Sequence, residues 1–127
     1  MSDKRSVLGK AGETLAAEHL RQSGYTILER NYRSRSGEID IIARQGKTLV
    51  FAEVKTRKSA SFGSPSAAVT LKKQAQISRV AQEYLARENL FDKPARFDVV
   101  AVFAPDGRKP EIEIITNAFE LHYSVAS

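Results

Sequence analysis

The sequence predicts a single α/β domain in which helices cover a mixed β-sheet, and two observations lead to this prediction. Segments with helical spacing of apolar residues and segments rich in β-forming residues follow one another in the order α, β, β, β, α, β, β. The chain of 127 residues is 42% hydrophobic and 28% charged, which is the size and composition of one globular domain with one core. Elements in this order build a sheet with helices on its faces, a layered α/β or α+β architecture.

The first half of the chain is expected to form a helix and three strands. Apolar residues recur at near-helical spacing over residues 7–23, and Gly24 is suited to end that helix. Residues 25–33 are rich in β-forming side chains and predict a strand. After a turn at SRSG, strands are expected at residues 37–44 and 48–56, and the RQGK sequence between them predicts a hairpin turn.

A loop and a second helix are expected next. Residues 57–67 are rich in Ser, Gly and Pro, which predicts a mobile loop. The helix is predicted from about Pro65 or Ser66 to Glu88. Its apolar members are expected to be Val69, Leu71, Ile77, Val80, Ala81, Tyr84 and Leu85.

Two further strands complete the predicted sheet. Residues 96–104, RFDVVAVFA, form a β-prone run that is typical of a buried central strand. Residues 111–116, EIEIIT, alternate between polar and apolar side chains, as an edge strand does. The tail from residue 117 is expected to hold a short helical turn and then to fray.

Composition excludes several kinds of site. The chain has no cysteine, so it has no thiolate metal site, no disulfide bond and no cysteine nucleophile. No apolar stretch approaches the roughly 18–20 residues that span a bilayer. The N-terminal sequence also lacks the apolar core of about 7–15 residues that a secretory signal requires. We therefore expect a cytoplasmic protein that does not enter a membrane.

The chain is basic, with 20 Lys and Arg residues against 15 Asp and Glu residues and a formal net charge of +5. Such an excess favours a polyanionic partner, most commonly nucleic acid, although a soluble basic domain without such a partner has the same charge. No acidic residue lies between Glu53 and Glu83, so this stretch is expected to be electropositive. The candidate contacts to DNA phosphates are Arg33, Arg35, Arg57, Lys58, Lys72, Lys73 and Arg79.

Three polar residues, Asp40, Glu53 and Lys55, interrupt the apolar pattern of the two strands in the predicted hairpin. Side chains alternate between the faces of a strand, so Glu53 and Lys55 share one face. A hairpin through RQGK can place Asp40 on the same side of the neighbouring strand. Two carboxylates held this close repel each other, and a divalent cation relieves the repulsion.

This combination of residues fits the hydrolysis of phosphodiesters. Asp40 and Glu53 supply the hard oxygen ligands that Mg²⁺ prefers, and Lys55 can hold the scissile phosphate or orient the attacking water. A solvated strand face carrying the same residues is the alternative, because an acid and a lysine two residues apart also occur by chance.

Other polar positions of these strands have simpler interpretations. Alternation places Ile39 and Ile41 together on the face opposite to Asp40. It places Glu38 on the same face as Asp40, at its rim. Asp98 interrupts its own strand, and we expect it to be paired with Arg96 or with a neighbouring strand.

The complete pattern resembles a known nuclease family. Asp40, twelve intervening residues and then Glu53-Val54-Lys55 resemble the PD-(D/E)XK nuclease motif. More closely, the chain resembles the YraN-like family of predicted endonucleases, which is similar to archaeal Holliday junction resolvases. The segments that carry this resemblance are AGETLAAEHL, NYRSRSGEIDIIA, LVFAEVKTRKSASFGSPSAAVTLKKQ and RFDVVAV, within residues 9–119.

The resemblance implies a restriction-endonuclease-like αβββαβ core over about residues 9–119 of the single domain 1–127. It also implies a DNA substrate, a site for Mg²⁺ or Mn²⁺ and a possible homodimer. Asp40 and Glu53 would then be metal ligands, and Lys55 would be the catalytic lysine. Glu13 matches an acid of the first helix that can contribute to the metal site, and Gln74 matches a glutamine of the second helix that can position phosphate or water.

Two functional hypotheses follow from the sequence, beside a third interpretation in which the chain is an unrelated basic α/β protein whose strand acids are solvated. The first is a metal-dependent DNA endonuclease, acting on branched or otherwise structured DNA. The second is a non-catalytic module on the same fold that binds nucleic acid or docks a partner. DNA binding that needs neither metal nor Asp40 distinguishes the second hypothesis from the first.

Overall fold

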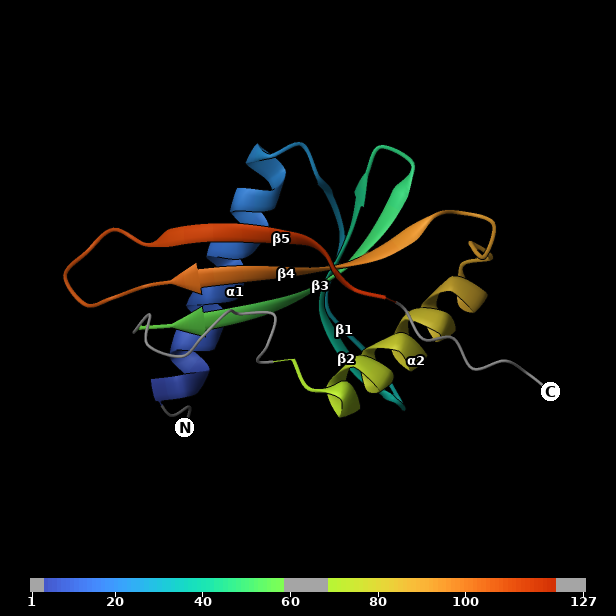
Figure 1. Ribbon diagram of the computed structural model, residues 1–127, viewed down its shortest axis with the longest axis horizontal. Coiled ribbons are helices and arrows are strands. Elements are labelled where there is room, and N and C mark those ends of the chain that lie inside the picture. Colours follow the sequence, from blue (N-terminus) through green and yellow to red (C-terminus); the bar gives the residue numbers. More distant parts are fainter. Residues whose placement is uncertain (1–3, 59–68, 121–127) are drawn as a thin grey trace.

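The computed structural model describes residues 4–58 and 69–120 and shows a five-stranded mixed sheet with one helix on each face (Figure 1). The strands lie in the order β1-β2-β3-β4-β5. β3 and β4 are parallel because the connection through α2 carries the chain back, and all other neighbours are antiparallel. The elements are α1 (Lys4–Gln22), β1 (Thr26–Ser34), β2 (Gly37–Gln45), β3 (Thr48–Arg57), α2 (Leu71–Arg87), β4 (Ala95–Phe103) and β5 (Glu111–Phe119).

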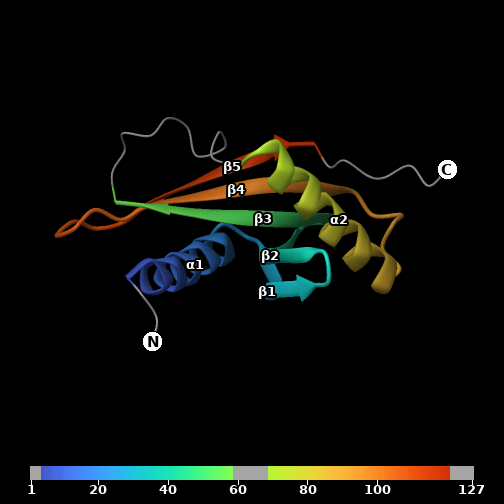
Figure 2. The same ribbon diagram turned by 90° about the horizontal axis from the view of Figure 1, so that it is seen from below.

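The predicted α/β architecture with a restriction-endonuclease-like order of elements is therefore confirmed. The two helices lie on opposite faces of the sheet, as the side view shows (Figure 2). None of the described helices combines the length and the apolar content needed to cross a bilayer.

Alternation along the central strand β3 divides the core between the two faces. Leu49 and Phe51 belong to the cluster that packs against α2, whereas Val50 and Ala52 belong to the cluster that packs against α1. Each large apolar side chain removed from water in this way contributes roughly 1.5–3 kcal/mol to the free energy of folding. The polar residues of β3 therefore lie on a strand that is held rigidly from both sides.

The end of α1 follows the sequence signal at Gly24. This residue has φ = 93°, a left-handed conformation that glycine adopts without steric cost. The N–H of Tyr25 then donates to the carbonyl of Leu20 at 2.9 Å, which satisfies an acceptor at the helix end. The chain enters β1 directly after this turn.

α1 also approaches the sheet closely at Gly12. A Cβ atom placed on Gly12 would collide with the side chain of Thr56, whereas a Cβ on Gly9 of the same helix would meet no atom within 4 Å. The close approach brings the neighbouring residue, Glu13, toward the sheet.

We therefore expect opposite effects from two matched substitutions in α1. Gly12→Ala should destabilise the protein by about 1–3 kcal/mol through the collision with Thr56. Gly9→Ala should stabilise it by up to about 1 kcal/mol, because alanine has the higher helix propensity. Chemical denaturation of both variants measures the difference, and equal effects would show that α1 does not require glycine at position 12.

The predicted start of α2 is wrong. The helix begins at Leu71, and Thr70 precedes it in an extended conformation, with its Oγ1 accepting a hydrogen bond from the N–H of Lys73 at 3.1 Å. This N-cap satisfies a backbone donor that would otherwise lack a partner, and it fixes the first turn. The expected loop falls mainly on residues 59–68, which lie outside the described residues.

Two predicted members of the apolar face of α2 also differ from expectation. Leu71 is 79% exposed, and Val69 is buried but precedes the helix. The other predicted members, Ile77, Val80, Ala81, Tyr84 and Leu85, are buried in the helix as expected.

At the C-terminal end, β4 is a buried inner strand and β5 is an edge strand, as predicted. β5 continues to Phe119, so the helical turn expected from residue 117 is wrong for residues 117–119. Phe119 stacks on Phe97 with their ring centroids 4.4 Å apart, and this contact favours the strand. The remainder of the expected tail, residues 121–127, lies outside the described residues.

Candidate functional site

The β2–β3 hairpin places Asp40 and Glu53 on adjacent strands. The antiparallel register of the two strands pairs Ile42 with Phe51 and Ile41 with Ala52. Asp40 is therefore the next residue on β2, and Glu53 is the next residue on β3. Glu53 is only 7% exposed, and Asp40 is half-buried. The two charges act on each other, since the charge of Asp40 raises the pKa of Glu53.

The path of β2 departs from regular alternation next to Asp40. Ile39 was expected on the same face as Ile41, but it packs in the α2 cluster and Ile41 in the α1 cluster, so this prediction is wrong. Across from this position on the partner strand, Asn31 has the left-handed value φ = 53°, between Arg30 and Tyr32, which pair with Ile41 and Ile39. Such backbone is uncommon for a residue other than glycine and departs from the regular strand conformation.

The Asp40 carboxylate is held by a backbone N–H of β3 and by a side chain of α1. Its Oδ2 accepts a hydrogen bond from the N–H of Val54 at 2.8 Å. Asp40 also shares a side-chain hydrogen bond with Glu13 of α1, which requires a proton on one of the two carboxyl groups. The structure thus brings Glu13, predicted only by resemblance, into contact with Asp40.

Asn31 completes this group, although it was not among the predicted site residues. With its amide nitrogen facing α1, Asn31 donates to both carboxylate oxygens of Glu13 at 3.1 Å each. A signal was present in the sequence, because asparagine is depleted in strands and tolerates left-handed backbone better than most residues. An asparagine within the predicted strand 25–33 therefore marked a position where the strand backbone is irregular.

The acids of this group resist ionisation. Burial, and then the charge of Asp40, raises the pKa of Glu13 from 4.5 to about 7. The same two causes, in the same order, raise the pKa of Glu53 from 4.5 to about 7. Burial also raises the pKa of Asp40, although the hydrogen bond from the Val54 N–H opposes this shift. Near neutral pH the site therefore favours a bound proton or a bound cation.

Two lysines face these acids from different elements. Lys55 shares the face of Glu53 on β3, and its Nζ lies 4.0 Å from Glu53 Oε1. Lys73 of α2 lowers the pKa of both Asp40 and Glu53 through its charge, against the larger effect of burial. The sequence placed Lys73 among the phosphate contacts, and its position beside the acids is an additional finding.

Gln74 is engaged at the start of α2. Its Nε2 donates to the carbonyl of Val69 at 3.1 Å, so in the described part of the chain this amide supports the helix start. Its predicted role in positioning phosphate or water stays a prediction. Glu38 lies at the rim as expected and pairs with Arg33 at 3.0 Å.

The donor atoms of the site suit a small hard cation. Asp40 and Glu53 offer carboxylate oxygens, and Mg²⁺ typically takes one or two carboxylates and keeps several waters. Among residues 4–58 and 69–120, no three His, Asp or Glu side chains converge as one ready-made metal site. The pair Asp40 and Glu53 thus fits the ion, while Glu13 is engaged with Asn31 and Asp40. Metal binding by these residues stays a prediction.

Removal of the Glu53 charge should change how stability depends on pH. The folded state binds the Glu53 proton more tightly than the unfolded chain, so stability falls as pH rises from about 4.5 to about 7. We expect Glu53→Gln to be more stable than the parent above pH 7 by up to about 3 kcal/mol, and this advantage should vanish below about pH 4.5. Denaturation across this pH range without divalent metal measures it, with the exposed Glu111→Gln as control. Parallel curves for parent and Glu53→Gln would contradict the assignment.

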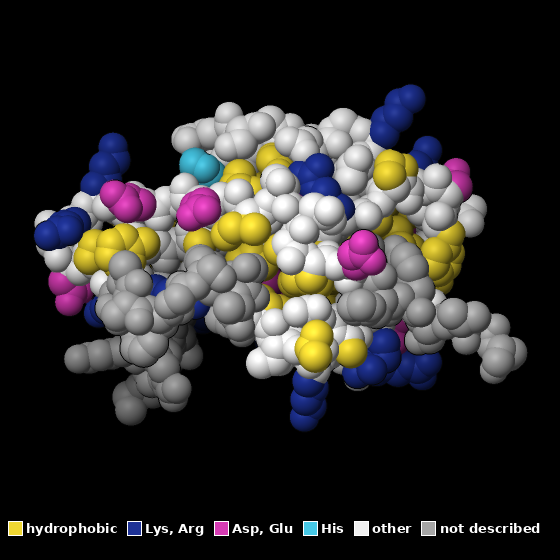
Figure 3. Space-filling model, in the orientation of Figure 1, with side chains coloured by type: hydrophobic (Ala, Val, Ile, Leu, Met, Phe, Trp, Pro, Cys, Tyr) yellow, Lys and Arg dark blue, Asp and Glu magenta, His cyan; other side chains and the backbone are white. Residues whose placement is uncertain are grey.

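Several predicted phosphate contacts meet where the start of α2 lies beside the β1–β2 turn. One hollow is lined by Thr70, Lys72, Lys73, Gln76 and Arg79. A second one shares Lys73 and Gln76 and is otherwise lined by Arg33, Ser34, Gly37 and Glu38. Lys and Arg side chains gather in this region, at the lower right of the view in Figure 3.

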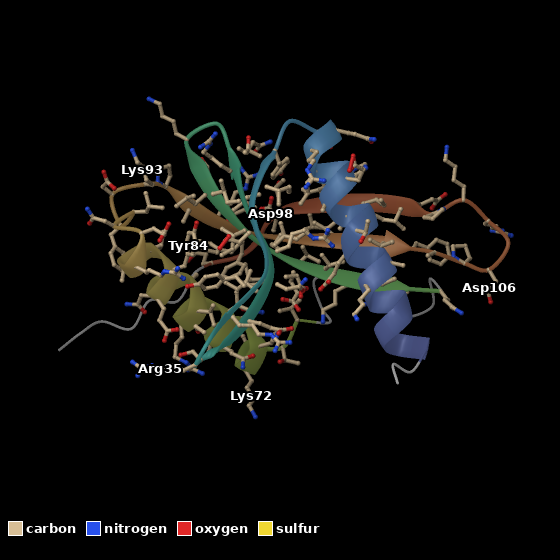
Figure 4. All side chains as sticks on the ribbon, turned by 180° about the vertical axis from the view of Figure 1, so that it is seen from behind. Arg35, Lys72, Tyr84, Lys93, Asp98 and Asp106 are labelled. Atoms are coloured by element: carbon tan, nitrogen blue, oxygen red, sulfur yellow. The ribbon has the colours of Figure 1, made fainter. Side chains whose placement is uncertain are left out.

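Gly37 allows this close packing of the turn under α2. It has φ = 143°, and a Cβ atom at this position would lie 2.6 Å from the Gln76 side-chain nitrogen. Arg35 and Lys72 lie at the same end of the molecule (Figure 4). We call the surface formed by Arg33, Arg35, Lys72, Lys73 and Arg79 the α2 basic surface.

The structure does not bring all predicted contacts together. Lys58 pairs with Asp106 at 3.4 Å, at the end of the sheet far from Arg35 and Lys72 (Figure 4). Arg57, the last residue of β3, is likewise separate from the start of α2 and is partly buried. DNA contacts by Arg57 and Lys58 stay predictions.

Asp98 has the structural role that the sequence favoured. Arg96 Nε donates to Asp98 Oδ1 at 2.9 Å, and the Tyr25 hydroxyl donates to Oδ2 at 3.1 Å. The backbone N–H of Asn117 also donates to Oδ1 at 3.0 Å. This fully buried acid therefore joins β4 to the start of β1 and to β5.

Comparisons with known proteins agree with the pattern of the chain. Residues 12–102 match the family model described as "Uncharacterised protein family UPF0102". A UPF0102 protein of Geobacter sulfurreducens is 52% identical, with 96% of this chain and 95% of that protein covered. A UPF0102 protein of Geotalea daltonii is 54% identical over 91% of each chain.

Among solved structures, the chain is similar to that described as "The structure of Pyrococcus Furiosus SfsA in complex with Ca2+". The TM-score is 0.38 and the sequence identity is 13%, with 85% of this chain and 62% of that chain covered. A similarity this low supports no inference about function. The identity to the curated relatives and the family match together show that the chain belongs to the UPF0102 family, the YraN-like family of predicted endonucleases.

Proposed function

We propose that this protein is a metal-dependent endonuclease that hydrolyses phosphodiester bonds in DNA, with branched or otherwise structured DNA as its substrate. One observation supports it most directly: Asp40 and Glu53 are held as neighbours in a hairpin, with raised pKa values and with Lys55 beside Glu53. A fold stabilised only by packing gains nothing from a buried glutamate next to a half-buried aspartate. A reaction that uses both acids accounts for their presence there.

Each residue of the site has a role in this proposal. Asp40 and Glu53 would hold Mg²⁺ or Mn²⁺, which when bound activates water and stabilises negative charge on phosphate. Lys55 would hold a non-bridging phosphate oxygen or orient the attacking water. Glu13, fixed by Asn31, keeps the Asp40 carboxylate in place.

The α2 basic surface would bind the DNA backbone next to the acids. Contacts to phosphates fix the position of a duplex but read no sequence. The loss of such contacts weakens all DNA ligands alike and lowers the salt dependence of binding. The surface therefore supports DNA binding that does not depend on base sequence.

The proposed activity predicts cleavage of DNA in the presence of Mg²⁺ or Mn²⁺. A panel of duplex, single-stranded, flap and four-way junction substrates should show cutting that Lys55→Met reduces by at least about a hundredfold, since a positioned charge on the reacting phosphate is worth about 3 kcal/mol or more. Lys47→Met, which removes a lysine from a turn distant from the acids, is the matched control. The proposal fails if no substrate of the panel is cut or if Lys55→Met cuts as well as the parent.

A non-catalytic module that binds nucleic acid is the second candidate function. It is favoured by the α2 basic surface, which is formed by side chains that do not include the acids. Under this alternative, DNA binding requires no metal and survives the loss of Asp40, and no cleavage is observed.

A further inference from the structure

A third hollow, of about 450 Å³, lies at the opposite end of α2 from the acid site. It is framed by β1, the β2–β3 turn and the connection from α2 to β4, which lie together at the upper right of Figure 1. Its lining is formed by Leu28, Arg44, Gly46, Lys47, Leu49, Leu90 and Lys93. We call it the leucine hollow.

The leucine hollow is separate from the acid site. Leu49 and Glu53 lie on one face of β3, roughly 13 Å apart at about 3.3 Å per residue. Phe51 lies between them, fully buried beneath α2. In Figure 4, Lys93 marks the end of the molecule with the leucine hollow, and Lys72 marks the start of α2. A molecule in the leucine hollow therefore does not touch Glu53.

The rim of the hollow is positively charged. Arg44, Lys47 and Lys93 are exposed, and none of them forms an ion pair within the described ranges 4–58 and 69–120. Figure 3 shows hydrophobic side chains beside Lys and Arg side chains at the upper right. Three cations around one opening attract a ligand that carries several negative charges.

The floor of the hollow selects the kind of anion. Leu28, Leu49 and Leu90 are aliphatic, and Leu28 and Leu90 pack against the α2 core cluster. Single-stranded nucleic acid is usually bound by stacking of bases on aromatic rings, and none of the lining residues is aromatic. An aliphatic side chain fits this floor better than a base, and carboxylates beside it would meet the three cations.

We propose that the leucine hollow docks an acidic peptide segment of a partner protein, with an aliphatic side chain on the three leucines and acidic side chains at Arg44, Lys47 and Lys93. The volume is large enough for more than one aliphatic side chain and lies within the usual range of about 300–1,000 Å³ for ligand sites. The docked segment leaves the acid site and the α2 basic surface open. This inference goes beyond the proposed endonuclease and does not depend on it.

The test uses a fluorescein-labelled peptide in which two leucines are flanked on both sides by aspartate and glutamate. We expect saturable binding to the full chain that weakens at least about tenfold when serine replaces the leucines, and at least about tenfold in Lys47→Glu/Lys93→Glu. The charge-matched control Lys72→Glu/Arg79→Glu should bind the peptide as the parent does. Lys47→Glu/Lys93→Glu should still bind DNA as the parent does, and circular dichroism checks that both double variants are folded.

Four results would overturn the proposal. The first is no saturable peptide binding up to about 1 mM. The second is an equal loss of peptide binding in both double variants. Displacement of the peptide by oligothymidylate would instead identify a nucleic-acid site. A gain in affinity of about tenfold or more after truncation of residues 121–127 would identify the chain's own C-terminal segment as the occupant.

Discussion

Asp40→Asn is expected to reduce metal-dependent DNA cleavage by at least about a thousandfold, a loss of about 4 kcal/mol of transition-state stabilisation. The substitution keeps the size of the side chain and one oxygen that can accept the hydrogen bond from the Val54 N–H, now 2.8 Å long. It removes the negative charge that a divalent cation requires from this position. The loss should therefore appear in the rate of cleavage while the fold is maintained.

The measurement is single-turnover cleavage of the best substrate of the panel, together with DNA binding. Asp92→Asn, which alters an exposed acid between α2 and β4, is the matched control and should cut as the parent does. DNA affinity of Asp40→Asn should equal that of the parent without metal, because the α2 basic surface is intact. Full cleavage by Asp40→Asn would show that the activity comes from another site or from a contaminant.

The same pair of measurements separates the two candidate functions. A parent protein that binds DNA, loses affinity with salt and cuts nothing in Mg²⁺ or Mn²⁺ would be a binding module. In that case Asp40→Asn changes no functional property, although it still relieves the repulsion among the acids. Cleavage that depends on Asp40 and Lys55 identifies an endonuclease.

β3 shows which part of the site can be predicted from the sequence. Strand alternation and a two-residue hairpin turn at Gly46-Lys47 suffice to place Glu53 and Lys55 on one face, next to Asp40. These are local properties, and the buried apolar residues on both faces leave β3 no alternative register. The prediction was correct because the rule of alternation holds along a regular ladder.

The rule fails on β2 beside Asp40. Ile39 packs on the unexpected face, Asn31 across from it on β1 has left-handed backbone, and Asp40 contacts Glu13. No period in the sequence encodes this local departure, which involves one dihedral angle of Asn31 and the contact of Asn31 with Glu13. The contact between α1 and Asp40 was therefore available only from family resemblance.

The start of α2 shows a second limit. Apolar spacing extends back past Thr70, and helical periodicity alone cannot distinguish a helix from an extended segment that buries Val69. The Thr70 cap decides the boundary, and it also directs Gln74 toward the Val69 carbonyl. Threonine at position 70, a residue type that commonly caps helix N-termini, was the signal that periodicity obscured.

Asp98→Ala is expected to destabilise the protein by about 3–5 kcal/mol, the usual cost of removing one partner from a buried ion pair. The substitution leaves the Arg96 guanidinium without its carboxylate, and it leaves the Tyr25 hydroxyl and the Asn117 N–H without an acceptor. Arg96 Nη2 also donates to Tyr25 at 2.8 Å and to Gln45 at 2.6 Å, so one side chain connects β2, β4 and the start of β1.

Denaturation with urea measures the loss, and Glu113→Ala on the exposed face of β5 is the control. A second variant separates the unpaired charge from the packing. If the isolated Arg96 charge causes most of the loss, Asp98→Ala/Arg96→Met should be more stable than Asp98→Ala alone, by about 1 kcal/mol or more. A loss below about 1 kcal/mol for Asp98→Ala would show that solvent reaches this end of the sheet. The contrast with Asp40 is physical: both acids interrupt a β-strand, but Asp98 is paired directly with the Arg96 guanidinium, whereas Asp40 lies among other acids.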